Sequence, residues 1–382
     1  MLNIVTICIY SGVLIKEPNC EALLTLSNLH LVGNINAKTL LSYCGSAEAV
    51  LSEKKSALIK IPGINETIAK SIIHRQTSTH ALKELAFMEK HNIRMLPYFD
   101  AYYPKRLKQI ADSPLYLFVK GPMDLNSQRF VAMIGTRKNT LYGTQMTEQL
   151  VAGLKKYNVN IISGLAYGID GIAHAKANAT RSPNCAVLAH GLDTIYPKKH
   201  YSLAQEIINT GGVLVTEHLS KTSMHPNLFP RRNRIVAGMS DACIVVESGI
   251  KGGSMITAGI SQKYNRTVFA IPGKKSDSMS IGCNQLIKSG QAMLCESAED
   301  IAKVMKWDRI SNHPSSQIEL FKELGENQKL IIDLLQSKIL SFDKLLVLSQ
   351  IPLGKLTTLL LEMEMEGLIQ GLQGNSYTAV LR

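Results

Sequence analysis

The stretch RFVAMIGTRKNTLYGTQMTEQLVAGLKKYNVNIISG, from Arg129 to Gly164, holds two short apolar segments on either side of a longer amphipathic one. Each apolar segment ends at a glycine, as a strand does before a tight turn. The order strand, helix, strand predicts two parallel strands joined by a crossover helix. Because the apolar segments do not alternate with polar residues, we expect these strands to be buried on both faces of the sheet.

The same pattern continues toward residue 305. Four more apolar segments with helix-like stretches between them are NCAVLAHG, GVLVTE, ACIVVES and TVFAIPG. A series of strands alternating with helices predicts an α/β fold with a doubly wound parallel sheet. We place this domain at residues 101–308.

The residues before this domain have a helical texture with short glycine breaks. Residues 20–100 predict a helical domain, and the patterns LVGNINAKTLL and IPGINETIAKSI within it are typical of helix–hairpin–helix or SAM-like domains. A hairpin glycine can present backbone amides to a DNA phosphate without reading bases. A purely structural hairpin is the alternative, and Glu66 beside the second glycine slightly favours it.

The residues after the sheet domain predict a separate small domain. Residues 309–325 include the polar break NHPSS and are interpreted as a linker. Residues 326–382 predict three short helices and then a hairpin turned at Gly374 and Asn375, which is the order of a winged helix.

Residues 1–19 form an apolar N-terminal extension. The extension lacks the basic region and cleavage site of a signal peptide, and its apolar part is too short to span a bilayer. We therefore expect a docked strand or helix, or a start codon placed too early, and no association with a membrane.

The net charge is +12, and the basic excess is concentrated in residues 126–300, with 19 Lys and Arg against 11 Asp and Glu. Such an excess fits a polyanionic partner, most simply nucleic acid. A basic surface that binds nothing is the alternative. The seven cysteines are scattered without a CxxC pair, so we expect no metal site, no disulfide framework and a reducing cytoplasm.

The end of the first sheet strand carries the sequence Gly135, Thr136, Arg137. A glycine lets the backbone turn tightly with its amides exposed, the threonine adds a hydroxyl, and the arginine adds a planar donor fork. These groups can hold a phosphate at a strand-to-helix turn. The segment does not have the spacing GxGxxG, so no dinucleotide or other cofactor is predicted.

Three further strand ends repeat this chemistry. Ser163 and Gly164 follow the second strand, Lys198 lies beyond the third, and a glycine turn containing Lys251, Gly252, Gly253 and Ser254 follows a later strand. The carboxyl ends of parallel strands share one edge, where ligands bind in open α/β sheets. We therefore expect these loops to converge, although any one of them alone could be an ordinary turn.

The sequence contains few residues in a pattern typical of a catalytic site. His174 falls on a helix where a structural histidine is the more common case, and Asp170 and Asp193 fit helix caps. Glu247 at a strand end is the best catalytic candidate, but a lone carboxylate could equally anchor Arg232 or Arg234. A Walker-type GKS/T segment is missing, so ATP hydrolysis is not predicted.

The segments VAMIGTR, SGLAYGIDGIAH, GLDTIYPK, FPRRNRIVAGMSD, GGSMITA, FAIPG and GCNQLIKSGQA follow one another in the order found in a known family. The chain resembles the DNA-processing protein A family (DprA, also called Smf) over roughly residues 95–300. The resemblance implies an extended Rossmann-like domain that binds single-stranded DNA and is not an enzyme. It also implies protection of DNA taken up in natural transformation, loading of the RecA recombinase, and a homodimer.

The resemblance also implies roles for single residues. Arg137 would be the main phosphate-binding arginine and Lys198 the second anchor, with Arg232 and Asn233 binding DNA or bracing their loop. Close contacts would come from Gly135, Thr136, Ser163, Gly164, Lys251, Gly252, Gly253 and Ser254. Tyr167 and His200 depart from the family pattern, which leaves their contacts with bases open.

Two other functions fit parts of the sequence. A phosphoribohydrolase-like enzyme of the same fold would use a glycine-rich segment that ESGIKGGSMITAG resembles only loosely. An adaptor could act through the C-terminal domain, whose last helix carries Glu362, Glu364 and Glu366 but one lysine and so does not suit a phosphate backbone.

Overall fold

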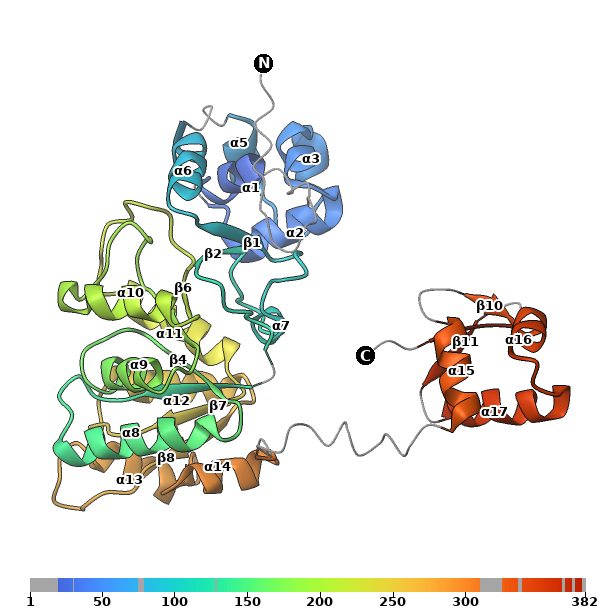
Figure 1. Cartoon of the computed structure of the whole chain (residues 1–382). Helices are drawn as coiled ribbons and strands as arrows, with labels where there is room; N and C mark the ends of the chain where they lie inside the picture. Colours follow the sequence, from blue (N-terminus) through green and yellow to red (C-terminus); the bar gives the residue numbers. More distant parts are fainter. Residues whose placement is uncertain are drawn as a thin grey trace. The chain divides into compact units, whose positions relative to one another are not determined.

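The computed structural model describes residues 20–29, 31–74, 79–127, 129–309, 325–335, 339–365, 368–372 and 375–379. The chain divides into two compact units, one reaching residue 310 and the other starting at residue 311 (Figure 1). The expected N-terminal extension at 1–19, residues 310–324 of the expected linker, and Gly374 of the expected hairpin turn lie outside the described residues.

In the described part of the first unit, nine strands form one sheet in the order β1–β2–β6–β5–β4–β3–β7–β8–β9. The strands from β3 to β9 pair in parallel, which confirms the doubly wound parallel sheet. Their bounds are Phe130–Ile134, Asn160–Ser163, Asn184–Val187, Val213–Thr216, Ala242–Val245, Thr267–Ala270 and Met293–Leu294.

Two antiparallel strands extend the sheet at one edge. Strand β1 (Arg94–Pro97) pairs with β2 (Tyr116–Lys120), and Phe118 of β2 is in register with Thr216 of β6. The sequence analysis did not identify either strand. Because β1 begins before residue 101, the sheet starts earlier than the proposed domain boundary.

Helices cover both faces of the sheet. Val131 and Met133 face a core with α8 (Leu141–Lys155), α9 (Ile169–Ala179) and α14 (Ala298–Met305). Phe130, Ala132 and Ile134 face the opposite core. That core includes residues of α7 (Lys105–Lys108), α11 (Leu228–Met239), α12 (Gly253–Lys263) and α13 (Ile281–Lys288). A further helix, α10 (Tyr201–Asn209), packs against β5, β6 and α9. Strands β3 to β8 are therefore buried on both faces, as their apolar sequences predicted, whereas the two residues of β9 are exposed.

The N-terminal helices pack around a core that continues onto the edge of the sheet. They are α1 (Cys20–Ser27), α2 (Asn34–Cys44), α3 (Ala47–Ser52), α4 (Lys55–Leu58), α5 (Glu66–Ile73) and α6 (Thr79–Lys90). Their core includes Leu115, Tyr116 and Phe118, and the Tyr116 hydroxyl lies 2.8 Å from the Ser27 hydroxyl. The helical domain is thus joined to the sheet by apolar and polar contacts.

The second unit contains α15 (Glu326–Leu335), β10 (Leu340–Ser341), α16 (Phe342–Ser349), α17 (Leu353–Met365), β11 (Ile369–Leu372) and β12 (Ser376–Ala379). Three helices and a small antiparallel sheet in the order β10–β12–β11 confirm the predicted winged helix within the described residues. Across those residues no single helix is long and apolar enough to cross a membrane. The α16–α17 pair passes that test only jointly, with a bend of 115°.

Candidate functional site

The chain adds strands β4, β5 and β6 on one side of β3 and then strands β7, β8 and β9 on its other side. The direction in which the sheet grows therefore reverses at β3. In open α/β sheets the crevice outside the carboxyl ends of such strands is the usual ligand site. Four of the loops singled out in the sequence leave this edge, after β3, β4, β5 and β7.

Buried backbone contacts hold these loops together. The Thr136 N–H donates to the carbonyl oxygen of Glu247 at 2.8 Å, and the Ile169 N–H donates to the carbonyl oxygen of Thr136 at 3.3 Å. Gly168 has φ +77°, and a Cβ there would lie 2.2 Å from the Thr136 oxygen. A Cβ at Gly135 would lie 2.4 Å from the Ile169 side chain, so close packing requires glycine at both positions.

Glu247 does not contact either arginine that the sequence offered as a partner. Its buried carboxylate accepts hydrogen bonds from the N–H of Thr140, at 2.9 Å, and from the Thr140 hydroxyl. Thr140 is the N-cap of α8, and its hydroxyl also accepts from the Gly143 N–H at 3.2 Å. Glu247 therefore anchors the start of a helix, which satisfies its charge with hydrogen bonds and removes it from contact with a substrate.

Arg232 is only 4% exposed, and its guanidinium contacts the backbone of the loop after β4 and of the last residue of β5. It donates a 2.6 Å hydrogen bond to the Gly164 carbonyl oxygen and a second one to the Val187 carbonyl oxygen. Burial lowers the pKa of Arg232 to about 10, and the nearby Asp170 carboxylate opposes this shift. Of the two roles considered for Arg232, the geometry fits bracing of the loop, because the charge does not reach the surface.

Three more of the expected contact residues are buried. The Ser163 hydroxyl donates to the Met133 carbonyl oxygen at 2.6 Å, and the Ser254 hydroxyl lies 2.7 Å from that of Ser248. A Cβ at Gly164 would lie 2.4 Å from the Arg232 guanidinium, so this glycine makes room for the arginine. Gly135, Thr136, Asn233 and Gly252 are half-buried, whereas Arg137, Lys198, Lys251 and Gly253 are exposed.

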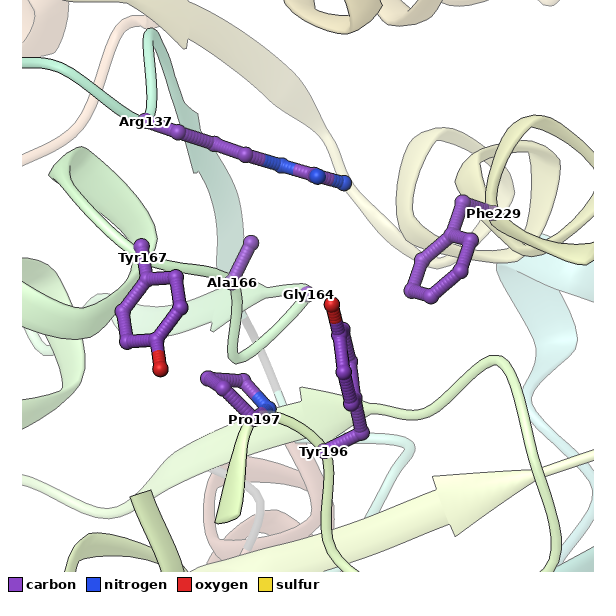
Figure 2. A pocket seen from close by; sticks show the side chains of 7 residues that line it. All are labelled: Arg137, Gly164, Ala166, Tyr167, Tyr196, Pro197 and Phe229. Carbon is purple, nitrogen blue, oxygen red and sulfur yellow. The ribbon is translucent and has the colours of Figure 1, made fainter. Parts of the chain in front are cut away.

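A small pocket is lined in part by Arg137 (Figure 2). The Arg137 side chain extends across it, and its guanidinium carbon lies 5.5 Å from the ring centre of Phe229. Tyr196 packs against Phe229 with ring centres 5.7 Å apart. The remaining lining residues are Gly164, Ala166, Tyr167 and Pro197. A cation among aromatic rings can hold a phosphate and stack a base.

Tyr196 and Phe229 are not among the residues predicted from the sequence to contact DNA. Both lie next to basic residues, in IYPKK and FPRRNR. Aromatic residues interleaved with cations are a signal for single-stranded nucleic acid, and that signal was available. Tyr167 also contacts His200, with ring centres 5.2 Å apart.

Exposed cations follow five of the six neighbouring strands from β6 to β8 at this edge, and β4 is the exception. They lie on the loops after β3, β5, β6, β7 and β8 and at the start of α11, and they are Arg137, Lys138, Lys198, Lys199, Lys221, Arg231, Lys251, Lys274 and Lys275. Among the described residues, none of them forms an ion pair with a carboxylate. From β6 to β8 this edge spans five strand spacings, or about 24 Å. We call these nine residues the basic edge.

The buried histidines His174 and His190 form hydrogen bonds inside the fold. His174 is fully buried, its Nδ1 lies 2.7 Å from Asn184 Oδ1, and burial lowers its pKa to about 4. His190 accepts the Tyr196 N–H at 3.2 Å through Nε2, and burial lowers its pKa as well. His174 is thus the structural histidine that its helical context indicated.

Comparison with known proteins identifies relatives of this chain. The family profile for DNA recombination-mediator protein A matches residues 94–306, and that for the DprA winged helix domain matches residues 322–375. DNA processing protein DprA of Bacillus subtilis is 38% identical over 218 residues, which cover 57% of this chain and 73% of that protein. Protein Smf of Escherichia coli is 36% identical over 215 residues, 56% of this chain and only 58% of the relative.

Solved structures show the same architecture. DNA processing protein A from Streptococcus pneumoniae matches with a TM-score of 0.65 and 30% identity, over 76% of this chain and 99% of the relative. DNA processing protein A from Helicobacter pylori, whose structure concerns its mode of binding single-stranded DNA, matches with a TM-score of 0.51 and 30% identity. That match covers 56% of this chain and 97% of the relative.

Proposed function

The chain belongs to the DNA recombination-mediator protein A family, and we propose that it binds single-stranded DNA along the basic edge of its sheet. The observation that carries this proposal is the juxtaposition of unpaired cations with the pocket formed by Arg137, Tyr196 and Phe229. Phosphates would be neutralised along the edge, and a base would stack in the pocket.

The aromatic rings support a preference for single strands. A base in a duplex is already stacked on its neighbours, so its face is not available to a protein ring, whereas an unpaired base has a free face. Little sequence preference is expected, because stacking and phosphate contacts do not read base edges.

We retain Gly135, Thr136, Arg137, Asn233, Lys198, Lys251, Gly252 and Gly253 as proposed DNA-contacting residues. Ser163, Gly164, Arg232 and Ser254 are proposed to shape the loops that carry them. We propose that the N-terminal hairpins are structural, because Lys55 and Lys70 there are paired with Glu66. We propose no catalytic role for any residue.

Membership of the family also supports a finer proposal. We infer that a homodimer in the cytoplasm protects single strands taken up in natural transformation and loads the RecA recombinase onto them. Residues 20–90, 94–308 and 326–382 are the proposed helical, DNA-binding and winged-helix domains, with the boundary after α6 moved to include β1 in the sheet. Formation of recombinase filaments on single strands coated with a single-strand-binding protein should accelerate when the chain is added.

The experiment that tests DNA binding is a salt titration by fluorescence anisotropy. A labelled oligothymidine and a duplex of the same length are titrated with full-length protein between about 50 and 200 mM salt. The logarithm of affinity for the single strand should fall by about 0.7 per contacted phosphate for each tenfold rise in salt. Binding that ignores salt, or equal affinity for the duplex, would contradict the proposal.

A further inference from the structure

A carboxylate of the N-terminal helical domain contacts the segment that carries Lys221 of the basic edge. Glu84 on α6 is only 6% exposed. It accepts hydrogen bonds from the Ser220 N–H, at 3.0 and 3.1 Å, and from the Ser220 hydroxyl at 2.6 Å. Within the described ranges no cation lies at ion-pair distance from Glu84. A buried carboxylate that has no cation nearby needs its hydrogen bonds to offset the cost of burying its charge. These hydrogen bonds therefore hold Ser220 in place against α6.

The segment that Glu84 contacts follows β6 and displays Lys221. Thr222 bonds back to the Leu219 carbonyl oxygen through its hydroxyl, at 2.7 Å, and through its N–H, at 3.3 Å. Lys221 lies in the left-handed region, with φ +60°, and its side chain is exposed. This conformation is uncommon for a residue other than glycine and persists where the surroundings impose it. The contacts of Glu84 and Thr222 on either side of Lys221 provide that constraint.

The loop after β5 rests on the same segment. A Cβ at Gly191 would lie 2.4 Å from the Leu219 carbonyl oxygen and 2.8 Å from Ser220 Cα. Leu192 and Leu219 both pack against the core of the N-terminal helices. The loop that begins at Gly191 continues to Tyr196 and Lys198. Two loops of the basic edge are therefore supported by the helical domain.

We propose that Glu84 is a positioning residue for DNA binding, which fixes the Ser220 segment so that Lys221 faces the same strand of DNA as Lys198. The helical domain then contributes to affinity without contacting DNA itself. This inference rests on the proposed binding of single-stranded DNA at the basic edge. Glu84 and its hydrogen-bond partner Ser220 are 136 positions apart in the sequence.

The test compares Glu84→Ala with Glu89→Ala, which alters an exposed carboxylate on the same helix. Oligothymidine affinity is measured against salt for both variants, for Lys221→Gln, and for the double variant Glu84→Ala with Lys221→Gln. Loss of one phosphate contact should reduce the salt slope by about 0.7 and weaken binding about fourfold at 0.15 M salt. Glu84→Ala and Lys221→Gln should each show this loss, and Glu89→Ala should not.

The double variant separates positioning from a general loss of stability. If Glu84 acts through the Lys221 segment, the double variant should bind no more weakly than about the weaker single variant. Additive losses, or wild-type affinity and slope in Glu84→Ala, would overturn the inference. If Glu84→Ala does not fold, Ser220→Ala removes the 2.6 Å hydroxyl bond but keeps the backbone bonds, and it should lower the affinity and the salt slope in the same direction by a smaller amount.

Amide hydrogen exchange in residues 217–222 distinguishes this inference from the proposed function. Exchange should accelerate there in Glu84→Ala measured without DNA. Unchanged exchange would overturn the positioning role even if the wild-type protein binds DNA. Failure of the wild-type protein to bind DNA would instead overturn the proposed function, and with it the consequence drawn for Glu84.

Discussion

The guanidinium of Arg232 donates to the carbonyl oxygen of Gly164 at 2.6 Å, and Gly164 lacks the Cβ that would collide with it. This pair joins the loop after β4 to helix α11, and the second hydrogen bond of Arg232 joins Val187, the last residue of β5, to the same helix. The neighbouring Arg231 is exposed. Two adjacent arginines in one sequence motif thus have different tasks, one inside the fold and one on its surface.

Substitution of Arg232 should therefore affect stability. Arg232→Met would leave the Gly164 and Val187 carbonyl oxygens without their donor and the buried Asp170 without a nearby positive charge. We expect the free energy of unfolding in urea to fall by about 3 kcal/mol. Arg231→Met is the matched control and should change it by no more than about 0.5 kcal/mol. Equal effects of the two substitutions would show that Arg232 is not the brace.

Substitution of Arg137 should affect DNA binding. Arg137→Ala removes the exposed cation of the pocket, and we expect a loss of about 1.5–3 kcal/mol in binding free energy. The salt slope should also fall by about 0.7, and Lys198→Ala should lower the slope in the same way. Anisotropy with oligothymidine measures both quantities.

Lys263→Ala is the control for Arg137→Ala, because Lys263 is exposed near the end of α12, before β8 begins at the opposite edge of the sheet. Arg129 would serve less well, since it donates to the Tyr157 and Asp308 carbonyl oxygens and lies over Trp307. If Lys263→Ala weakens binding as much as Arg137→Ala, the basic edge is not the binding site.

Glu247 offers a test between an anchor and a catalytic group. Glu247→Gln would place an amide against the Thr140 donors, so the free energy of unfolding should fall by about 1–3 kcal/mol. Affinity for oligothymidine should stay within about twofold of wild type, because the backbone bond to Thr136 is kept. Release of base from nucleoside monophosphates by the wild-type protein, abolished in this variant, would support the enzymatic alternative.

Burial of His174 should make stability depend on pH. Its pKa is lowered from 6.5 to about 4 in the folded protein, so the unfolded chain binds the extra proton first as pH falls. Stability is therefore full above about pH 6.5 and decreases toward pH 4, by up to about 3 kcal/mol. Urea unfolding of wild type and His174→Gln across this range checks the difference. Parallel pH profiles for the two proteins would contradict this account.

The winged helix should contribute little to the affinity for single-stranded DNA. In α17, Leu356, Leu360 and Met363 are buried in the core of that unit, while Glu362 and Glu364 are exposed. Exposed carboxylates repel a phosphate backbone. A chain ending at Lys322 should keep most of the affinity for oligothymidine. If it folds, as judged by circular dichroism, but no longer binds, the winged helix is a DNA-binding element.

Much of the architecture could be predicted from short-range patterns. The six apolar segments became β3 to β8, because strands buried on both faces need apolar side chains at every position. In α17 the apolar residues Leu356, Leu360 and Met363 recur at helical spacing, which places them on one buried face. The glycines after the strands marked where the chain turns, and the parallel order placed those turns at one edge.

The roles of polar residues depended on contacts between distant segments. Nothing in the letters RRNR separates Arg231 from Arg232, because burial of a guanidinium requires acceptors, and these come from Gly164 and Val187 on other strands. Likewise, the hydrogen bonds of Glu247 with Thr140 and of Glu84 with Ser220 join residues that are far apart in the sequence, so they form only in the folded chain. The identity of a charged residue does not show whether its side chain is solvated or buried. Only the tertiary structure supplies the partners that make its burial possible.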